Sequence, residues 1–175
     1  MKNLFLCIAL AFSATAFAQY NYSETATNGT TIVQGQYSAN PGINANDDKH
    51  TIATKLAGVQ KVGQWKYWTE SGVLIAEEHY TMSGVRTGVW KTWTNSGVLS
   101  TEMNFSAGTA VFYHDNGQKA EEGGINADMQ HIGTWKGWHA NGTLNYEGAF
   151  DSNGNKTGLW KFYDQSGASI GTENH

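Results

Sequence analysis

Four glutamates recur at equivalent places along this 175-residue chain and could form a row of carboxylates: Glu77, Glu102, Glu122 and Glu147. Such a row could hold a metal ion or support acid–base catalysis. Catalytic pairs, however, need two carboxyl groups in different environments. Repetition gives these four glutamates equivalent surroundings, so the pattern favours a structural role over a catalytic one.

Three of the glutamates follow a lysine at a fixed distance. The pairs are Lys66 and Glu77, Lys91 and Glu102, and Lys136 and Glu147, each eleven residues apart around a glycine-containing segment. If that segment is a four-residue hairpin loop, each lysine lies directly opposite its glutamate on the neighbouring strand. Opposite charges in that position stabilise a strand pair by about 0.2–1 kcal/mol. The spacing therefore predicts the register of the hairpins.

Motifs for metals, cofactors and nucleophiles are missing from the sequence. The six histidines do not share a repeat position, and none is paired at ligand spacing. Asp151, Asn153 and Asn155 are spaced like the start of a calcium loop, but Lys156 stands where such a loop needs glycine. We find no nucleotide-binding loop and no base-activated nucleophile. We expect no catalytic residue, no metal site and no cofactor, and hence no enzyme.

Aromatic residues form two series that are three residues apart. The first series is Trp65, Trp90, Trp135 and Trp160, and the second is Trp68, Trp93, Tyr113, Trp138 and Tyr163. Because successive side chains of a strand alternate between its faces, an odd spacing predicts that the series lie on opposite faces. We expect the first series in the core of the repeat. The second series could form an exposed aromatic strip that binds protein, sugar or lipid.

Two series of glycines mark a repeating unit. Gly63, Gly88, Gly108, Gly133 and Gly158 begin the units, at separations of 25, 20, 25 and 25 residues, and a turn glycine follows nine residues later, as Gly72, Gly97, Gly117, Gly142 and Gly167. Short aromatic-rich runs on both sides of this turn predict a β-hairpin. Apolar residues of the unit are assigned to its core together with the first tryptophan series: Leu74, Leu99, Leu144, Tyr80, Phe105 and Phe150. A lone hairpin is marginal in water, so the units must pair edge to edge. The prediction is an all-β repeat protein with an elongated, single, antiparallel twisted sheet of five to six stacked hairpins.

The repeat also predicts the division of the chain. Units are expected at about residues 63–87, 88–107, 108–132, 133–157 and 158–175, with a degenerate first unit at 19–37 that echoes the later ones. Residues 38–62 form an insertion. Its first part, SANPGINANDD, is typical of a loop, and HTIATKLAGV is compatible with a strand or a short helix.

Residues 1–18 have the features of a secretory signal peptide. Lys2 precedes an apolar run, and Ala16-Phe17-Ala18 fits a cleavage site before Gln19. Cleavage removes the only cysteine and leaves 157 residues with a net charge of −5. This acidity argues against nucleic acid as a partner. The expected location is periplasmic, outer-membrane associated or secreted.

The repeat pattern resembles the MORN-type repeat in its bacterial, antitoxin-like variant. Gly63-Gln64-Trp65-Lys66-Tyr67-Trp68, the matching blocks at 88, 133 and 158, and the following leucine and glutamate carry the likeness. In the third unit Ala110 and Val111 replace tryptophan and lysine. The resemblance implies an antiparallel sheet of stacked hairpins and a binding or scaffolding role.

Three functional hypotheses remain at this level. The first is an exported, non-enzymatic module for protein–protein interaction or scaffolding in the cell envelope, using the aromatic face or the edge strand of the last hairpin. The second is binding of envelope glycan or lipid through an exposed aromatic strip. The third, implied by the resemblance, is a periplasmic antitoxin or immunity protein.

Overall fold

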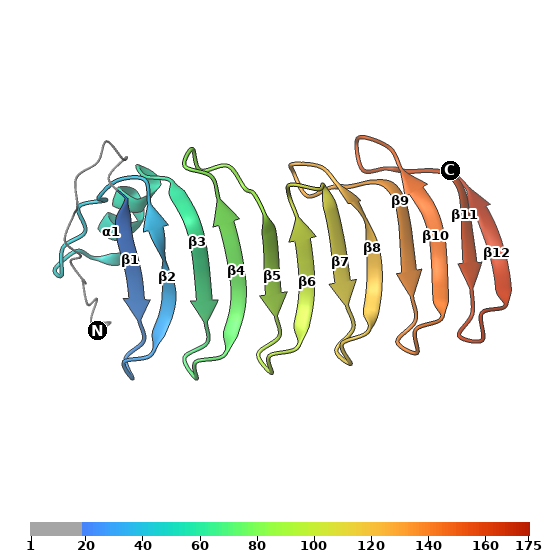
Figure 1. Ribbon diagram of the computed structural model, residues 1–175, viewed down its shortest axis with the longest axis horizontal. Coiled ribbons are helices and arrows are strands. Elements are labelled where there is room, and N and C mark those ends of the chain that lie inside the picture. The colour runs from blue at the N-terminus through green and yellow to red at the C-terminus, as the bar shows by residue number, and fades with distance from the viewer. Residues whose placement is uncertain (1–18) are drawn as a thin grey trace. The chain divides into compact units, whose positions relative to one another are not determined.

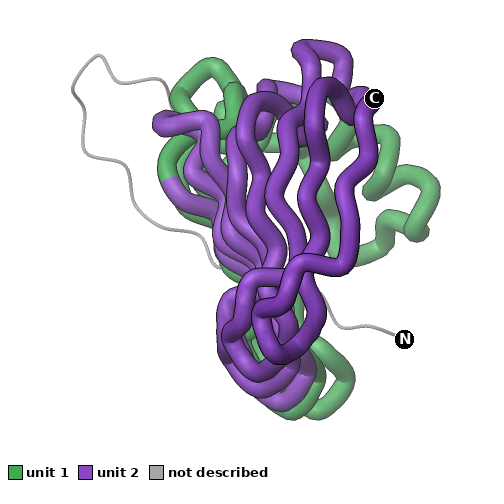
Figure 2. Tube along the Cα trace, turned by 90° about the vertical axis from the view of Figure 1, so that its right-hand side faces the viewer, with its two compact units in different colours: residues 1–88 green, residues 89–175 purple. Residues whose placement is uncertain are grey.

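A computed structural model of the chain describes residues 19–175. The predicted signal peptide, residues 1–18, lies outside the described residues. The chain divides into two compact units after Gly88, unit 1 up to residue 88 and unit 2 from residue 89 (Figure 2).

Unit 1 is a sheet of four antiparallel strands with one helix. The strands are β1 (Tyr20–Thr25), β2 (Thr31–Tyr37), β3 (Lys61–Trp68) and β4 (Leu74–Tyr80), and each pairs with the next in the chain. Residues 20–37 and 61–80 thus form two hairpins. The connection between them carries helix α1 (Lys49–Ala57) inside the segment read as an insertion (Figure 1).

Local sequence signals explain the bounds of α1. The carboxylate of Asp48 accepts a hydrogen bond of 2.7 Å from the backbone N–H of Thr51, which caps the first turn. Gly58 follows the last helical residue. Ile52 and Leu56 of the helix pack against a cluster formed by Tyr22, Tyr37 and Trp65, together with Ile43. The helix therefore covers one face of the sheet of unit 1.

Unit 2 consists of four antiparallel hairpins in chain order. Its strands are β5 (Val89–Trp93), β6 (Leu99–Asn104), β7 (Thr109–Tyr113), β8 (Lys119–Ile125), β9 (His131–Trp138), β10 (Leu144–Phe150), β11 (Lys156–Tyr163) and β12 (Ser169–Asn174). In each unit the hairpin turns lie at one end of the strands and the other connections lie at the opposite end (Figure 1). The predicted all-β fold of stacked antiparallel hairpins is confirmed.

The two glycine series adopt the backbone conformation that favours glycine. The turn glycines have φ between 80° and 85°, and the glycines that begin each unit have φ between 62° and 66°. Other residues are sterically disfavoured in this left-handed region because of their Cβ atom. The repeated glycines thus fix both the hairpin turn and the entry into the first strand of each hairpin.

Tryptophans of the first series join one hairpin to the next. Trp65, Trp135 and Trp160 are at most 2% exposed. Each ring lies against a glycine of the preceding strand, Gly35, Gly123 and Gly148 respectively, where an added Cβ would approach ring atoms to 2.1–2.4 Å. Each indole N–H donates to the carbonyl of the residue after that glycine, at 3.1, 2.9 and 3.2 Å. A tryptophan, a glycine and a backbone carbonyl therefore form one repeated contact between hairpins.

Trp90, the remaining tryptophan of the first series, and the aromatic residues assigned to the core pack differently from the three buried tryptophans. Trp90 is half-buried and makes an edge contact with Phe105, with ring centroids 4.9 Å apart. Tyr80, Phe105 and Phe150 pack against the buried clusters.

The three leucines assigned to the repeat core take a different place. Leu74, Leu99 and Leu144 lie opposite Trp68, Trp93 and Trp138 of the second series. A β-bulge beside each of these pairs shifts the register by one residue, so the leucine shares a face with the second series.

Candidate functional site

The predicted register of charged residues is confirmed in all three hairpins. Lys66 is opposite Glu77, Lys91 is opposite Glu102, and Lys136 is opposite Glu147. The lysine-bearing side of each sheet is opposite to the buried tryptophans, because Lys66, Lys91, Lys136 and Lys161 each follow a first-series tryptophan directly. We call this side the lysine face of unit 1 or of unit 2.

A row of register partners crosses the lysine face of unit 2 from β5 to β12. In order it contains Lys91, Glu102, Val111, Glu122, Lys136, Glu147, Lys161 and Thr172. Lys91 and Glu102 form an ion pair at 3.1 Å, and Lys161 and Glu147 form another at 3.0 Å. Val111 interrupts the alternation of charge. The glutamates therefore do not form an unbroken ladder of carboxylates, since Val111 lies between Glu102 and Glu122 and Lys136 lies between Glu122 and Glu147.

The neighbouring lysines lower the pKa of Glu147. The Lys161 ammonium hydrogen-bonds to the carboxylate and holds the pKa of Glu147 below its usual range, with a smaller contribution from the charge of Lys136. The same hydrogen bond raises the pKa of Lys161. Both groups remain charged at neutral pH, so this part of the row is a mixed-charge surface and not an acid–base pair.

The second aromatic series lies beside this row, toward the hairpin turns. Trp93, Tyr113, Trp138 and Tyr163 of unit 2 are half-buried, and each lies two residues after a member of the row. Their cross-strand partners are Leu99, Lys119, Leu144 and Ser169. The ammonium of Lys119 lies 5.2 Å from the centre of the Trp138 ring. Aromatic and leucine side chains therefore alternate along the turn side of the lysine face, with Lys119 among them.

A shallow hollow of about 300 Å³ opens on the same face over β9, β10 and β11. Thr134, Glu147, Ala149, Thr157, Leu159 and Lys161 line it. Leu159 is 55% exposed, which is unusual for a large apolar residue among polar neighbours. The repeat pattern does not predict this hollow, because Leu159 stands where the other units carry Gln64, Val89, Thr109 or Thr134, which are not all of one residue type.

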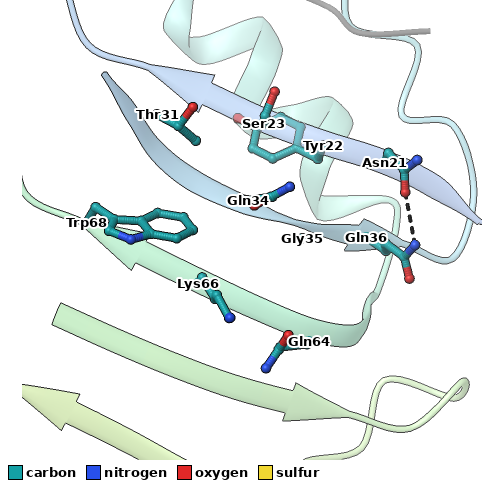
Figure 3. Close-up of a pocket in the computed structure, with 10 residues that line it drawn as sticks. All are labelled: Asn21, Tyr22, Ser23, Thr31, Gln34, Gly35, Gln36, Gln64, Lys66 and Trp68. Carbon is teal, nitrogen blue, oxygen red and sulfur yellow. Dashed lines mark hydrogen bonds between the residues drawn. The ribbon is translucent and has the colours of Figure 1, made fainter. Parts of the chain in front are cut away.

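The lysine face of unit 1 has different side chains from that of unit 2. Trp68, the remaining member of the second series, is half-buried and stands beside Lys66 in a larger hollow of about 670 Å³. The amide side chains of Gln34 and Gln36 on β2 and of Gln64 on β3 also line this hollow (Figure 3). The five aromatic residues of the predicted strip thus lie on the lysine faces of the two units, opposite the buried series.

Residues 19–175 contain no group of three or more histidines, cysteines, aspartates or glutamates arranged to hold a metal ion. The carboxylate of Asp151 instead accepts hydrogen bonds from the backbone N–H groups of Asn153 and Asn155 within a turn. No helix in this described part of the chain is long and apolar enough to cross a membrane.

Stacked hairpins with fixed register, joined by buried tryptophans, define a β-hairpin repeat protein. The model of the MORN repeat variant family matches residues 61–81, 86–107 and 132–152. The predicted resemblance to the MORN repeat variant is thus confirmed for three repeats of the chain. Repeats of this family are non-enzymatic modules that generally interact with proteins or membranes.

Comparison with other proteins adds little. No curated protein matches the chain. Among solved structures, a mutant of S. aureus TarM in complex with fondaparinux, alpha-GlcNAc-glycerol and UDP is similar at 11% identity and a TM-score of 0.31, over 64% of this chain and 18% of that chain. A second TarM structure gives 12% identity and a TM-score of 0.30, over 63% and 17%. The chain spans less than a fifth of these proteins, and likenesses this weak carry no argument about function.

Proposed function

We propose that this protein is an exported, non-enzymatic interaction module of the cell envelope, whose lysine face in unit 2 binds a partner protein. The observation that carries the proposal is the juxtaposition of a mixed-charge row with a row of half-buried aromatic and leucine side chains on one face. Protein interfaces combine aromatic anchors with a polar rim in this way.

The opposite face offers less to a partner. Trp135 and Trp160 are at most 2% exposed there, and their rings are held by the glycines and carbonyls of neighbouring strands. On the lysine face, Trp138 and Tyr163 retain exposed surface, and Leu159 adds an exposed apolar side chain beside the ion pair of Glu147 and Lys161. A partner that covers Leu159 and Trp138 would remove apolar surface from water without disturbing the core.

The experiment is site-specific photo-crosslinking in cells that naturally produce the protein. A photoreactive phenylalanine analogue is placed at Lys136, Trp138 or Leu159 on the lysine face of unit 2. Control positions are Asp128 and Asn153, which are exposed in the connections between hairpins. We expect one discrete adduct of constant mass from the three test positions and none from the controls. Adducts that are equally abundant at the control positions, or absent everywhere, would contradict the proposal.

A further inference from the structure

A hollow on the lysine face of unit 1 differs chemically from the rest of the repeat. Its volume is about 670 Å³, within the range of about 300–1,000 Å³ that is common for ligand pockets. Ser23, Gln34, Gln36, Gln64, Lys66 and Trp68 line it. In Figure 3 α1 lies behind the strands and these side chains lie in front, so the hollow is on the face that the helix leaves open.

Lys66 and its counterpart Lys161 face different residues on the preceding hairpin. In unit 2 Lys161 lies opposite Glu147 of the preceding hairpin and is ion-paired to it at 3.0 Å. In unit 1 the residue opposite Lys66 on the preceding hairpin is Gln34. On its other side Lys66 lies opposite Glu77, but that carboxylate bonds to Gln64 and His79. Among the described residues, Lys66 has no salt bridge.

The first hairpin replaces the charged pair of later units with uncharged polar groups. Ser23 lies opposite Gln34 on β1 and β2, in the position where Lys136 lies opposite Glu147. Gln36 donates a hydrogen bond of 2.9 Å to Asn21, which leaves its own carbonyl oxygen available. The side chains of Ser23 and Gln34 make no hydrogen bond to another described residue. The hollow therefore presents several unused donors and acceptors around one unpaired ammonium.

Trp68 supplies an apolar surface at the side of these polar groups. Its ring is half-buried and borders the hollow with Lys66 and Gln34 (Figure 3). A pyranose ring has the matching chemistry, since one side carries C–H groups that pack on an aromatic face and its rim carries hydroxyls that both donate and accept hydrogen bonds. Amide side chains can do both at once, which suits adjacent hydroxyls. The lining of the hollow contains no carboxylate side chain.

We infer that this hollow is a saccharide-binding site. Trp68 stacks on a sugar ring, the amides of Gln34 and Gln36 and the hydroxyl of Ser23 bond to its hydroxyls, and Lys66 bonds to a hydroxyl or to an acidic substituent. The site belongs to unit 1 alone and does not depend on protein binding by unit 2. Its amide groups arise where the first hairpin departs from the repeat, so one sugar site is expected and not one in every hairpin.

The test is calorimetric titration of the full purified protein with cellotriose, chitotriose and trigalacturonate. We expect saturable binding of at least one of these at millimolar or tighter affinity. Trp68→Ala should weaken that binding at least about tenfold. Trp138→Ala removes the corresponding ring of unit 2 and should leave the affinity within about twofold. If trigalacturonate alone binds and Lys66→Gln abolishes its binding, the site takes an acidic sugar. If a neutral trisaccharide binds equally well to the parent protein and to Lys66→Gln, the site takes a neutral sugar.

A second variant guards against loss of folding in Trp68→Ala. Gln34→Glu restores the carboxylate of the repeat and should form the ion pair that Glu147 and Lys161 already show, so the variant should fold normally. It should nevertheless weaken saccharide binding at least about tenfold, because Lys66 and the amide are withdrawn from the ligand. The inference is overturned if none of the three saccharides binds, or if Gln34→Glu and a folded Trp68→Ala bind as tightly as the parent protein.

Discussion

The ring of Trp135 lies against the backbone of Gly123, its direct partner on the neighbouring strand, and its indole N–H reaches the carbonyl of Gly124 at 2.9 Å. Trp160 repeats this arrangement with Gly148 and Ala149, and Trp65 does so with Gly35 and Gln36. The glycine is needed because any Cβ there would occupy the space of the indole. The packing of one hairpin against the next therefore requires both the tryptophan ring and a glycine, without a side chain, on the neighbouring strand.

The first prediction concerns that glycine. Gly123→Ala places a Cβ within about 2.4 Å of Trp135 ring atoms, so the ring must move from its buried position. We expect a loss of about 1–3 kcal/mol in the free energy of unfolding, typical of overpacking. Gly58→Ala is the matched control, because its φ is −83° and its nearest neighbour would be 3.5 Å from the new Cβ. Denaturant titration measures both, and equal stability of the two variants would contradict the packing argument.

The second prediction separates the two tryptophan series. Trp135→Ala removes a side chain that is 0% exposed and should cost about 3–5 kcal/mol. Trp138→Ala removes a half-buried ring from the lysine face and should cost clearly less. Thermal unfolding followed by circular dichroism gives the comparison. A larger loss from Trp138→Ala than from Trp135→Ala would reverse the assignment of core and surface.

The third prediction concerns His131, whose ring stacks on Trp135 with centroids 3.6 Å apart and an interplanar angle of 15°. Burial lowers the pKa of His131, and the charge of Glu121 opposes this shift only in part. Because the unfolded chain then binds a proton at higher pH than the folded one, this contribution to stability is full above a pH of about 6.5 and is lost as the pH falls through the folded pKa.

His131→Phe keeps an aromatic ring against Trp135 but cannot titrate. Melting temperatures measured from pH 8 to pH 5 should therefore fall more steeply for the parent protein than for the variant. Parallel curves for the two proteins would show that His131 does not contribute to the pH dependence.

The fourth prediction tests export. If residues 1–18 are a signal peptide, the protein recovered from its own cells begins at Gln19 and lacks Cys7. Mass spectrometry of the intact protein and of its N-terminal peptide shows this directly, and fractionation of the cells shows the compartment. Recovery of a chain that still starts at Met1 in the cytoplasm would remove the basis for an envelope role.

Much of the fold could be predicted from the sequence because the residues that set the turn and the register of each hairpin lie within that hairpin. Turn glycines at 72, 97, 117, 142 and 167 require a positive φ, and the eleven-residue spacing of lysine and glutamate gives the register correctly. The side of Leu74, Leu99 and Leu144 was not predictable in the same way, because β-bulges beside the turn move these residues to the other face. A bulge depends on how two strands pair, so the residue types of one strand do not predict it.

The glycines beneath the tryptophans could have been found from the sequence. Gly123 and Gly148 each stand twelve residues before a first-series tryptophan, whereas Gly35 stands thirty residues before Trp65, with the insertion between them. What they do becomes clear only when the strands are paired, since a glycine twelve residues away has no local reason to meet an indole.

By itself the sequence determined that the chain is a series of hairpins, where each hairpin turns, and which charges lie opposite one another. These properties follow from backbone preferences and spacing within about twenty-five residues. The tertiary structure decided which residues of different hairpins meet. It places Gln34 beside Lys66 and Trp68 across an insertion that contains α1, and it leaves Leu159 exposed next to an ion pair. Such sites combine side chains from separate hairpins, so their chemistry arises only when the sheet is assembled.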